Sequence, residues 1–583
     1  MKLLSLTAAM SALATFAAAE DLTTYSLVID RDGAIFTKVL TSTIGNTDAG
    51  YAQQYVTNTN IHVYTVGDAE ASSSFWAYLH PQFPGERHQK LQISSWKRVV
   101  VDENHADVAL EYARKLDTIQ DVTDQEYNAL KRKIDFMILP LISLIYGVQY
   151  MDKSTTSFAA IMGLRTDLNM VGQQYSWTTT AFYLAFLAAV FPLSRCLQRF
   201  PLVKTTSICV ILWGIVLTCH AACSNYAGFI VCRILLGCLE SAVTPGFVLL
   251  SAKWYRQEES FLRTVVYYSN NGFGTIIGCA IAYGCYVHAD SYSIAAWKVL
   301  FIVTGVMTIV LGGMLMVHIP DNPPDAWFLN KREKVLVFQR VKDSKQGYGN
   351  PEWKWYQFKE SLIDPRTWLG FFYAFSSNIP NGGLGSFMSI LLSDSLKYGD
   401  KKSLLMRMPG GAVETVGLIA FALFVGKFPY RIGISSFITV VVIVGSGMLA
   451  FSSNTHAQLA GLYLYSLSPI GMICFLSLFG SNTLGYSKKV TSQAILLIGY
   501  CVGNLVGPQT FLSTEAPGYH SAKIAIVVCY VFSLFCLFAL FGVNYFDNKR
   551  RERLESENPP PEIENLEFSD LTDYEMPGFR YLY

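Results

Sequence analysis

The sequence predicts an all-α membrane protein with twelve transmembrane helices in two six-helix bundles. Composition, a repeated apolar run and one charged connection support this fold class. Of the 583 residues, 51% are hydrophobic and only 15% are charged, whereas soluble proteins carry roughly 25% charged residues. From residue 134 onward, apolar runs recur that reach about 20 residues, the length that a helix needs to cross a bilayer.

The apolar runs fall into two groups of six. The first group lies near 134–152, 175–195, 204–223, 226–250, 265–287 and 298–318. The second group lies near 367–391, 409–427, 433–453, 457–483, 491–512 and 521–546. Between them, the segment 320–366 opens with "IPDNPP", whose prolines stop a helix, and continues with charged residues. We therefore expect bundles over 134–319 and 367–546, joined by a linker over 320–366, with a central cavity between the two lobes.

Basic residues predict the orientation of these helices. Lys and Arg cluster before the first run and in alternate loops after it, whereas the other loops carry few, apart from 397–407. Cytoplasmic loops of membrane proteins carry an excess of Lys and Arg. We therefore expect both ends of the core in the cytoplasm, with 98–133 as a lead-in, 320–366 as a cytoplasmic linker and 547–583 as a tail.

The N-terminal residues conflict with this topology. Residues 1–19 contain one Lys, a short apolar stretch and a small-residue end near Ala19, which is typical of a signal peptide. Residues 20–97 are polar and mixed, with strand-like patches such as "IHVYTV", and stay unassigned. A cleaved signal peptide would export residues 20–130. We favour a fused or mispredicted exon over a genuine extra segment.

Composition also limits the possible partners. The net charge of +1 gives no reason to expect nucleic acid. The cysteines lack CxxC or zinc-like spacing, so neither a metal site nor a cofactor is expected. No catalytic constellation or phosphate-binding lysine loop is evident, so neither an enzyme nor ATP-driven transport is predicted. The expected partners are the lipid bilayer, protons and a small anionic substrate, and the expected form is a multi-pass monomer in the plasma membrane.

Two opposite charges interrupt the fourth apolar run, "FIVCRILLGCLESAVTPG". Arg233 and Glu240 are seven residues apart, so they lie two turns apart on one helix face, with Gly237 between them. Charges inside a bilayer are costly unless they face a cavity or a partner. One interpretation is a buried ion pair that locks helices together. The other is an Arg that faces the cavity and attracts an anionic substrate, beside a Glu that binds and releases protons.

The first run ends with a second pair of charges. In "YGVQYMDKSTTS", Asp152 and Lys153 are expected at or just past the membrane edge. They form either an interfacial pair or a titratable group and a cation that face the same cavity. Tyr146 and Gln149 precede them in this run and are candidates for contact with substrate, although aromatic packing is an equal alternative.

Four separated segments resemble the fungal allantoate permease group, in the anion:cation symporter branch of the major facilitator superfamily. They are "YGVQYMDKSTTSFAAIMGL", "CRILLGCLESAVTPGFVLLSAKWYRQEE", "DPRTWLGFFYAFSSNIPNGGLGSF" and "KKVTSQAILLIGYCVGNLVGPQTF". The resemblance covers about residues 102–550 and excludes 1–97. It implies alternating access and proton-driven uptake of small carboxylates or ureides.

The resemblance also implies roles for individual residues. In related anion symporters, an acid at the end of helix 1 and an acid in helix 4 take part in proton coupling, and these match Asp152 and Glu240. The helix 4 arginine matches Arg233. The basic residue after the helix 1 acid is often Arg and is Lys153 here, which keeps the charge but loses the planar fork of donors.

Amide side chains supply the other substrate-binding candidates. "SSNIPNGGLGSF" contains Asn378 and Asn381 beside helix-weakening Pro and Gly, and their amides suit a ureide or carboxamide; hydrogen bonding between helices is the alternative. Gln509 follows a Gly-Pro break in "GYCVGNLVGPQTF" and is a candidate for the cavity wall.

The predicted function is that of a proton-coupled symporter that imports a small organic anion, such as allantoate, ureidosuccinate or another carboxylate, by alternating access. The alternative is a nutrient sensor or facilitator on the same scaffold without proton coupling. The presence of Asp152, Glu240 and Arg233 favours the symporter.

Overall fold

The computed structural model describes residues 24–29, 35–40, 124–343, 353–425, 430–557, 570–576 and 578–583. The chain divides into two units, Met1–Ile119 and Gln120–Tyr583. In the first unit, β1 (Thr24–Ile29) and β2 (Ile35–Leu40) pair in antiparallel register, with Thr24 opposite Leu40 and Ile29 opposite Ile35. The signal-like segment 1–19 and the "IHVYTV" patch lie outside the described residues.

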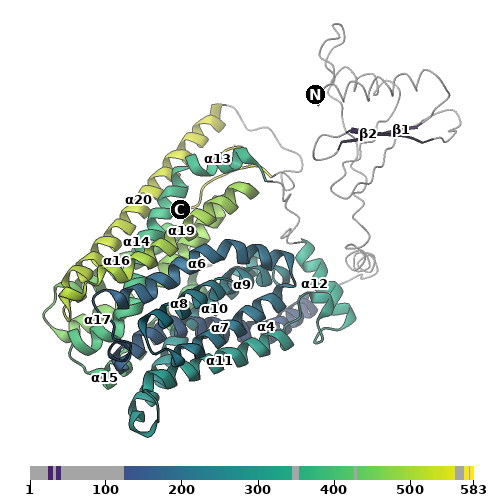
Figure 1. Ribbon diagram of the computed structural model, residues 1–583. Coiled ribbons are helices and arrows are strands. Elements are labelled where there is room, and N and C mark those ends of the chain that lie inside the picture. Colours follow the sequence, from purple (N-terminus) through teal and green to yellow (C-terminus); the bar gives the residue numbers. More distant parts are fainter. Residues whose placement is uncertain are drawn as a thin grey trace. The chain divides into compact units, whose positions relative to one another are not determined.

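In the second unit, the regular structure of the described residues is helical (Figure 1). The first group of helices comprises α4 (Asp124–Ala159), α5 (Arg165–Asp167), α6 (Gln174–Arg199), α7 (Leu202–Cys219), α8 (Tyr226–Glu240), α9 (Val243–Trp254), α10 (Gln257–Val287) and α11 (Ala296–His318). Two shorter helices follow, α12 (Lys331–Asp343) and α13 (Trp355–Ile363). The last group comprises α14 (Pro365–Ile390), α15 (Asp400–Val425), α16 (Arg431–Phe451), α17 (Thr455–Tyr465), α18 (Ser468–Asn482), α19 (Tyr486–Val506) and α20 (His520–Glu557).

Ten helical segments of the described chain are long and apolar enough to cross a membrane. The predicted runs 265–287 and 367–391 are not among the ten; they correspond to α10 and α14. Both helices contain asparagines and glycines that reduce their apolar character. Both also line the central cavity described below, where polar side chains do not meet lipid. We therefore assign α10 and α14 as the remaining two crossings.

Two crossings are built from helix pairs. α8 and α9 form the segment Tyr226–Trp254, and α17 and α18 form Thr455–Asn482. In each pair a proline stands in the first turn of the second helix, Pro245 in α9 and Pro469 in α18. A proline lacks the backbone N–H that would continue the preceding helix, so the helix breaks there. The break directly follows Glu240 at the end of α8.

Three helix pairs join the two groups: α10 packs along α15, α6 along α19 and α4 against α14. Glycine permits the closest approaches. A Cβ at Gly274 of α10 would lie 2.0 Å from the carbonyl oxygen of Gly147 in α4, and a Cβ at Gly272 would lie 2.2 Å from that of Gly411 in α15. Any side chain at these positions would clash with backbone. Helix α10 is therefore held tightly between a helix of each group.

The segment between the two groups contacts both of them. Helix α12 pairs with α4: Lys133 lies 2.7 Å from Glu333, and Arg332 lies 2.8 Å from Glu126. Helix α13 packs instead on α19 and α14. Helix α12 thus packs on the first half and α13 on the second. The connection joins the two halves, and each of its helices stays attached to one of them.

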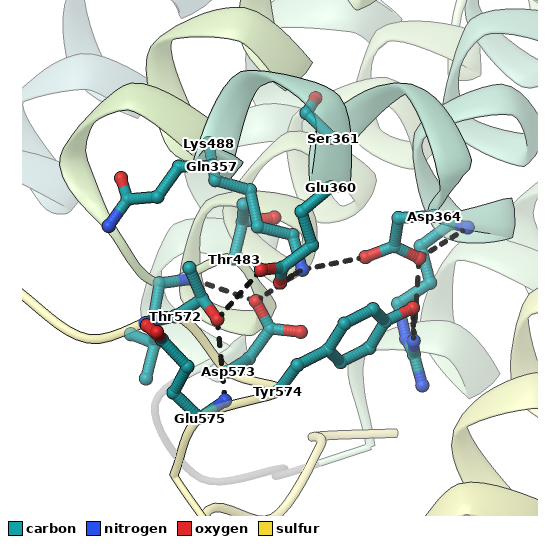
Figure 2. A network of polar contacts seen from close by, with 12 residues as sticks. Gln357, Glu360, Ser361, Asp364, Thr483, Lys488, Thr572, Asp573, Tyr574 and Glu575 are labelled. Atoms are coloured by element: carbon teal, nitrogen blue, oxygen red, sulfur yellow. Dashed lines mark hydrogen bonds and ion pairs between the residues drawn. The ribbon is translucent and has the colours of Figure 1, made fainter. Parts of the chain in front are cut away.

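The C-terminal residues 570–576 and 578–583 fold back onto the end of the second half, where Lys488 is the centre of a charged cluster (Figure 2). Its Nζ lies 2.9 Å from Glu360, 2.9 Å from Asp364 and 2.7 Å from Asp573. Lys488 is only 1% exposed. One buried cation therefore connects α13, the start of α14, the start of α19 and the tail.

Further contacts fasten the same tail. The ring of Tyr581 lies 3.7 Å from the Arg366 guanidinium, and the Tyr581 hydroxyl donates to Asp573 at 2.6 Å. Arg551 of α20 donates to the carbonyls of Met576 and Asp573. Burial, followed by the neighbouring Asp364 carboxylate, raises the pKa of Tyr574 to about 12, so its phenol stays neutral in this cluster. The tail is therefore an integral part of this end of the second half.

This cluster predicts a large stability loss for Lys488→Ala. The substitution leaves three neighbouring carboxylates without their shared cation, and removing one partner of a buried pair costs about 3–5 kcal/mol. We expect a marked fall in the midpoint of thermal unfolding, measured on purified protein by intrinsic fluorescence. The adjacent variant Lys489→Ala is the control and should change the midpoint little. Equal effects of the two variants would contradict this account.

Candidate functional site

A cavity of about 590 Å³ lies between the two halves of the second unit. Helices α4, α6, α9 and α10 line it from one half, and α14, α15, α16, α18, α19 and α20 line it from the other. Its volume falls in the usual range for small-molecule sites, roughly 300–1,000 Å³. The polar lining includes Tyr146, Gln149, Tyr150, Lys153, Tyr268, Asn271, Ser377, Asn378, Asn381, Glu414 and Tyr500.

The cavity extends toward the predicted cytoplasmic side. Its lining includes Ser194 near the end of α6 and Gln493 near the start of α19. The same helix ends carry Arg195, Arg199 and Lys489, the basic residues that predict a cytoplasmic location. With that predicted orientation, the cavity faces the cytoplasmic side.

The opposite side is closed by hydrogen bonds between the halves. Arg407 of α15, which is 7% exposed, donates to the hydroxyls of Ser154 and Ser157 in α4 and of Ser389 in α14, at 3.1 to 3.2 Å. The Tyr175 hydroxyl of α6 donates to the Ser386 carbonyl at 2.8 Å. A buried guanidinium that holds three serines from two halves closes the outer end without a carboxylate partner among these contacts.

Lys153 and Glu240 form an ion pair on the wall of the cavity. The Lys153 Nζ lies 3.0 Å from Glu240 Oε1. The Lys153 side chain is 24% exposed and lines the cavity, whereas that of Glu240 is fully buried. Lys153 therefore stands between the cavity and the carboxylate. It is the cation that a ligand in the large cavity can reach.

Asp152 lies deeper in the protein than the sequence suggested. Helix α4 continues to Ala159, so Asp152 and Lys153 lie within the helix and not at its end. The polar residues that follow Lys153 extend the helix and face protein. Asp152 is fully buried, and its Oδ2 accepts a hydrogen bond from Trp213 Nε1 at 2.5 Å.

Arg233 is also buried, at 3% exposure, and it is absent from the lining of the large cavity. It shares a small cavity of about 40 Å³ with Glu240 and Lys153. The guanidinium lies 5.1 Å from the ring of Phe229 and 5.5 Å from that of Phe301. Arg233 thus faces a space suited to water, not the space that would hold an organic anion.

Tyr146 and Gln149 of α4, both predicted to contact substrate, lie on the wall of the large cavity. The Tyr146 ring also packs 5.1 Å from Tyr267 and 5.5 Å from Tyr268. This residue therefore both lines the cavity and takes part in aromatic packing. Gln149 is 2% exposed, and its Nε2 meets no acceptor in the described part of the chain.

The amide candidates differ in position. Asn378 and Asn381 line the large cavity, but both are joined to Asn504: Asn381 donates to it at 2.9 Å and Asn378 accepts from it at 3.3 Å. Gln509 lies in a short 3₁₀ turn, outside the lining of the described cavities, and donates to Thr180 of α6 at 2.8 Å. Gln509 therefore joins the halves, and a direct contact with substrate is not what this geometry favours.

The sequence interpretation missed Arg407 and Glu414. Both lie in α15, seven residues apart in "RMPGGAVE", with Gly410 and Gly411 between them. This is the spacing of Arg233 and Glu240 around Gly237. The signal that identified the first pair would therefore have found the second, had Arg407 not been taken as a loop residue.

Comparison with known proteins agrees with this geometry. Residues 142–508 match the model of the Major Facilitator Superfamily, and the chain belongs to this family of membrane transporters. It is 46% identical over 497 residues to the allantoate permease of Saccharomyces cerevisiae, covering 83% of this chain and 91% of that one. It is also 46% identical over 478 residues to an uncharacterised transporter of Schizosaccharomyces pombe, covering 82% and 93%.

Among solved structures, the chain resembles a bacterial homologue of the human lysosomal transporter Spinster in an inward-facing and occupied conformation. The TM-score is 0.52 at 14% identity, covering 69% of this chain and 95% of that one. This likeness concerns the fold alone. The family match and the two transporter relatives establish a multi-pass membrane transporter and not an enzyme, for which the plasma membrane is a plausible location.

The ion pair on the cavity wall predicts a test by double substitution. Lys153→Met removes the ion-pair partner of the buried Glu240 carboxylate, which should lower the free energy of unfolding by about 3–5 kcal/mol. The loss should shrink as the pH falls, because protonation neutralises the carboxylate. The double variant Lys153→Met/Glu240→Gln should recover most of the stability. Additive losses in thermal unfolding across pH 5 to 8 would show that the two groups do not interact.

Proposed function

We propose that this transporter is a proton-coupled symporter that imports a small organic anion, such as allantoate or ureidosuccinate, by alternating access. The observation that carries the proposal is the Lys153–Glu240 pair at 3.0 Å. It lies at the boundary between a large cavity and buried protein, where one cation can serve either a resident carboxylate or an incoming one.

The coupling follows from competition for Lys153. A substrate carboxylate that enters the cavity binds the exposed part of Lys153 and weakens its hold on Glu240. An unpaired buried carboxylate is strongly disfavoured, so Glu240 takes up a proton. Substrate and proton then occupy the protein together. When the substrate leaves, Lys153 returns to Glu240 and the proton is released.

Arg233 and Asp152 set the electrostatic conditions for this exchange. Both are buried beside the small cavity or behind it, and Arg233 contributes a permanent positive charge near Glu240. We propose that Arg233 keeps the empty carrier from binding a proton too tightly, and that Asp152 is a second proton-binding group. Because Lys153 lines the large cavity, we assign it the first contact with the substrate carboxylate.

Alternating access requires that the outer closure opens. Arg407 and its serine partners form neutral and charge-assisted hydrogen bonds, which water can replace one by one when the halves part. The inner side lacks such a closure at Ser194 and Gln493, which line the cavity. The geometry therefore supports exchange between this inward-facing arrangement and an outward-facing one.

The substrate proposal draws on the relative at 46% identity, which is an allantoate permease. The same site would suit other small carboxylates, because a lysine ammonium recognises the charge and not a particular carbon skeleton.

Symport predicts that uptake of radiolabelled allantoate rises as the external pH falls and that accumulation collapses with a protonophore. Glu240→Gln should abolish accumulation against a gradient while leaving exchange of internal for external allantoate, because a permanently neutral side chain cannot release its proton. The assay is uptake and counterflow in cells or proteoliposomes that contain the full chain.

Asp167→Asn is a suitable control, since it removes a carboxylate outside the cavity yet keeps an acceptor for Trp297, which donates to Asp167 at 2.7 Å. Unchanged accumulation by Glu240→Gln would contradict the coupling role. Uptake without accumulation in the unmodified protein would instead indicate a facilitator, and substrate binding without uptake would indicate a sensor.

A further inference from the structure

We propose that Glu414, together with Asn271, selects substrates that carry N–H donors, so that the favoured ligand is a carboxylate with a ureido, amide or amino group at its other end. Glu414 is thus a specificity-determining residue. This inference rests on the proposed function, because it assumes that the large cavity is the substrate site and that Lys153 receives the carboxylate.

The two side chains lie on one seam of the cavity wall. Asn271 is adjacent to Gly272 in α10, and Glu414 is adjacent to Thr415 in α15. At this seam a Cβ on Gly272 would lie 2.5 Å from the Thr415 hydroxyl, which itself donates to the Ser269 carbonyl at 3.1 Å. Because these backbones are locked together, Asn271 and Glu414 are held close to each other, and both line the large cavity.

Both residues present an acceptor that no donor satisfies. Glu414 and Asn271 are each 5% exposed. Neither Glu414 Oε1 nor Asn271 Oδ1 meets a donor among the described residues. Buried polar atoms are nearly always hydrogen-bonded, since an unsatisfied one costs about 1–3 kcal/mol. Two such acceptors side by side on a cavity wall are the surface that a ligand with N–H groups would satisfy.

Neither of the nearby cations, Arg407 and Lys153, forms an ion pair with the Glu414 carboxyl group. Arg407 shares the helix with Glu414, but its terminal nitrogens donate to serine hydroxyls. Lys153 lies on the opposite half and is paired with Glu240 at 3.0 Å. In the described chain no lysine or arginine forms an ion pair with Glu414. A donor from the ligand would be the partner that this group lacks.

The cavity is therefore bipolar. The N-terminal half of the protein contributes a cation, Lys153, to the cavity wall, and the C-terminal half contributes acceptor oxygens at Glu414. A ligand carboxylate is attracted to Lys153, and ligand N–H groups find acceptors at Glu414, which orients the molecule across the cavity. Ureido N–H groups at the far end would then donate to the Glu414 oxygens and satisfy the acceptor that no protein donor reaches. A plain carboxylate of the same size would leave Glu414 unsatisfied.

The test compares two ligands that differ in donors and little in shape. Allantoate carries two ureido arms on its carboxylate-bearing carbon, and 2-propylpentanoate carries two propyl arms there. Dissociation constants are measured on the purified full chain in lipid nanodiscs. Glu414→Gln should weaken allantoate about 10- to 100-fold, the loss of one strong hydrogen bond or two. The dissociation constant of 2-propylpentanoate should change less than about threefold.

Two further variants support the reading, and one serves as a control. Glu414→Asp keeps the carboxyl group but shortens the side chain, so its loss of allantoate affinity should be intermediate; Asn271→Ala should also weaken allantoate selectively. Should Glu414→Gln fail to fold, as judged by size-exclusion chromatography, these two carry the test. Asp167→Asn, outside the cavity, should bind both ligands as the unmodified protein does.

The outcomes separate the two proposals. Equal weakening of both ligands by Glu414→Gln, or no weakening of either, overturns the selectivity role while the carrier function stands. If the unmodified protein prefers 2-propylpentanoate, the inference is wrong. If the unmodified protein binds neither carboxylate, it is the proposed function that fails, and the inference fails with it.

Discussion

The contact on which the rest of this transporter depends is a single ion pair between a lysine on the cavity wall and a buried glutamate. Glu240 is fully buried, and Lys153 reaches it from the cavity side at 3.0 Å. In water such a pair would contribute little. Here, breaking it leaves an uncompensated charge in protein. In the proposed mechanism, the cavity therefore holds a substrate carboxylate at Lys153 only when a proton neutralises Glu240.

The surrounding helices maintain this constraint. Glycines at 147 and 274 bring α4 and α10 into backbone contact and fix the helix that carries Lys153, and the break after α8 follows Glu240 directly. Arg407 closes the outer end, so the cavity reaches one side at a time. The tail around Lys488 lies at the other end of the second half and fastens α13, α14 and α19 to one another. The Arg407 contacts and the Lys488 cluster each consist of a few polar contacts in otherwise apolar surroundings, where losing one contact has a large effect on stability.

Much of the fold could be predicted from the sequence, because membrane crossings have a clear signal in run length and charge. The two least apolar crossings, α10 and α14, were predicted as well, although their asparagines weaken that signal. Paired charges such as Arg233 and Glu240 could be located on one helix face, but the space that each one meets could not, since it depends on helices distant in sequence. The pairing of Lys153 with Glu240 on a distant helix could not be predicted for the same reason, and Arg407 and Glu414 were missed through a loop assignment.

The most direct measurement of the central claim is the number of protons taken up when allantoate binds to the purified protein. Isothermal titration calorimetry in buffers of different ionisation enthalpy gives this number, because protons taken up by the protein are released by the buffer with a known heat. If the substrate displaces Glu240 from Lys153, allantoate binding near neutral pH is accompanied by net proton uptake. Binding heats that are the same in every buffer would show that substrate and proton bind independently, and would contradict the account.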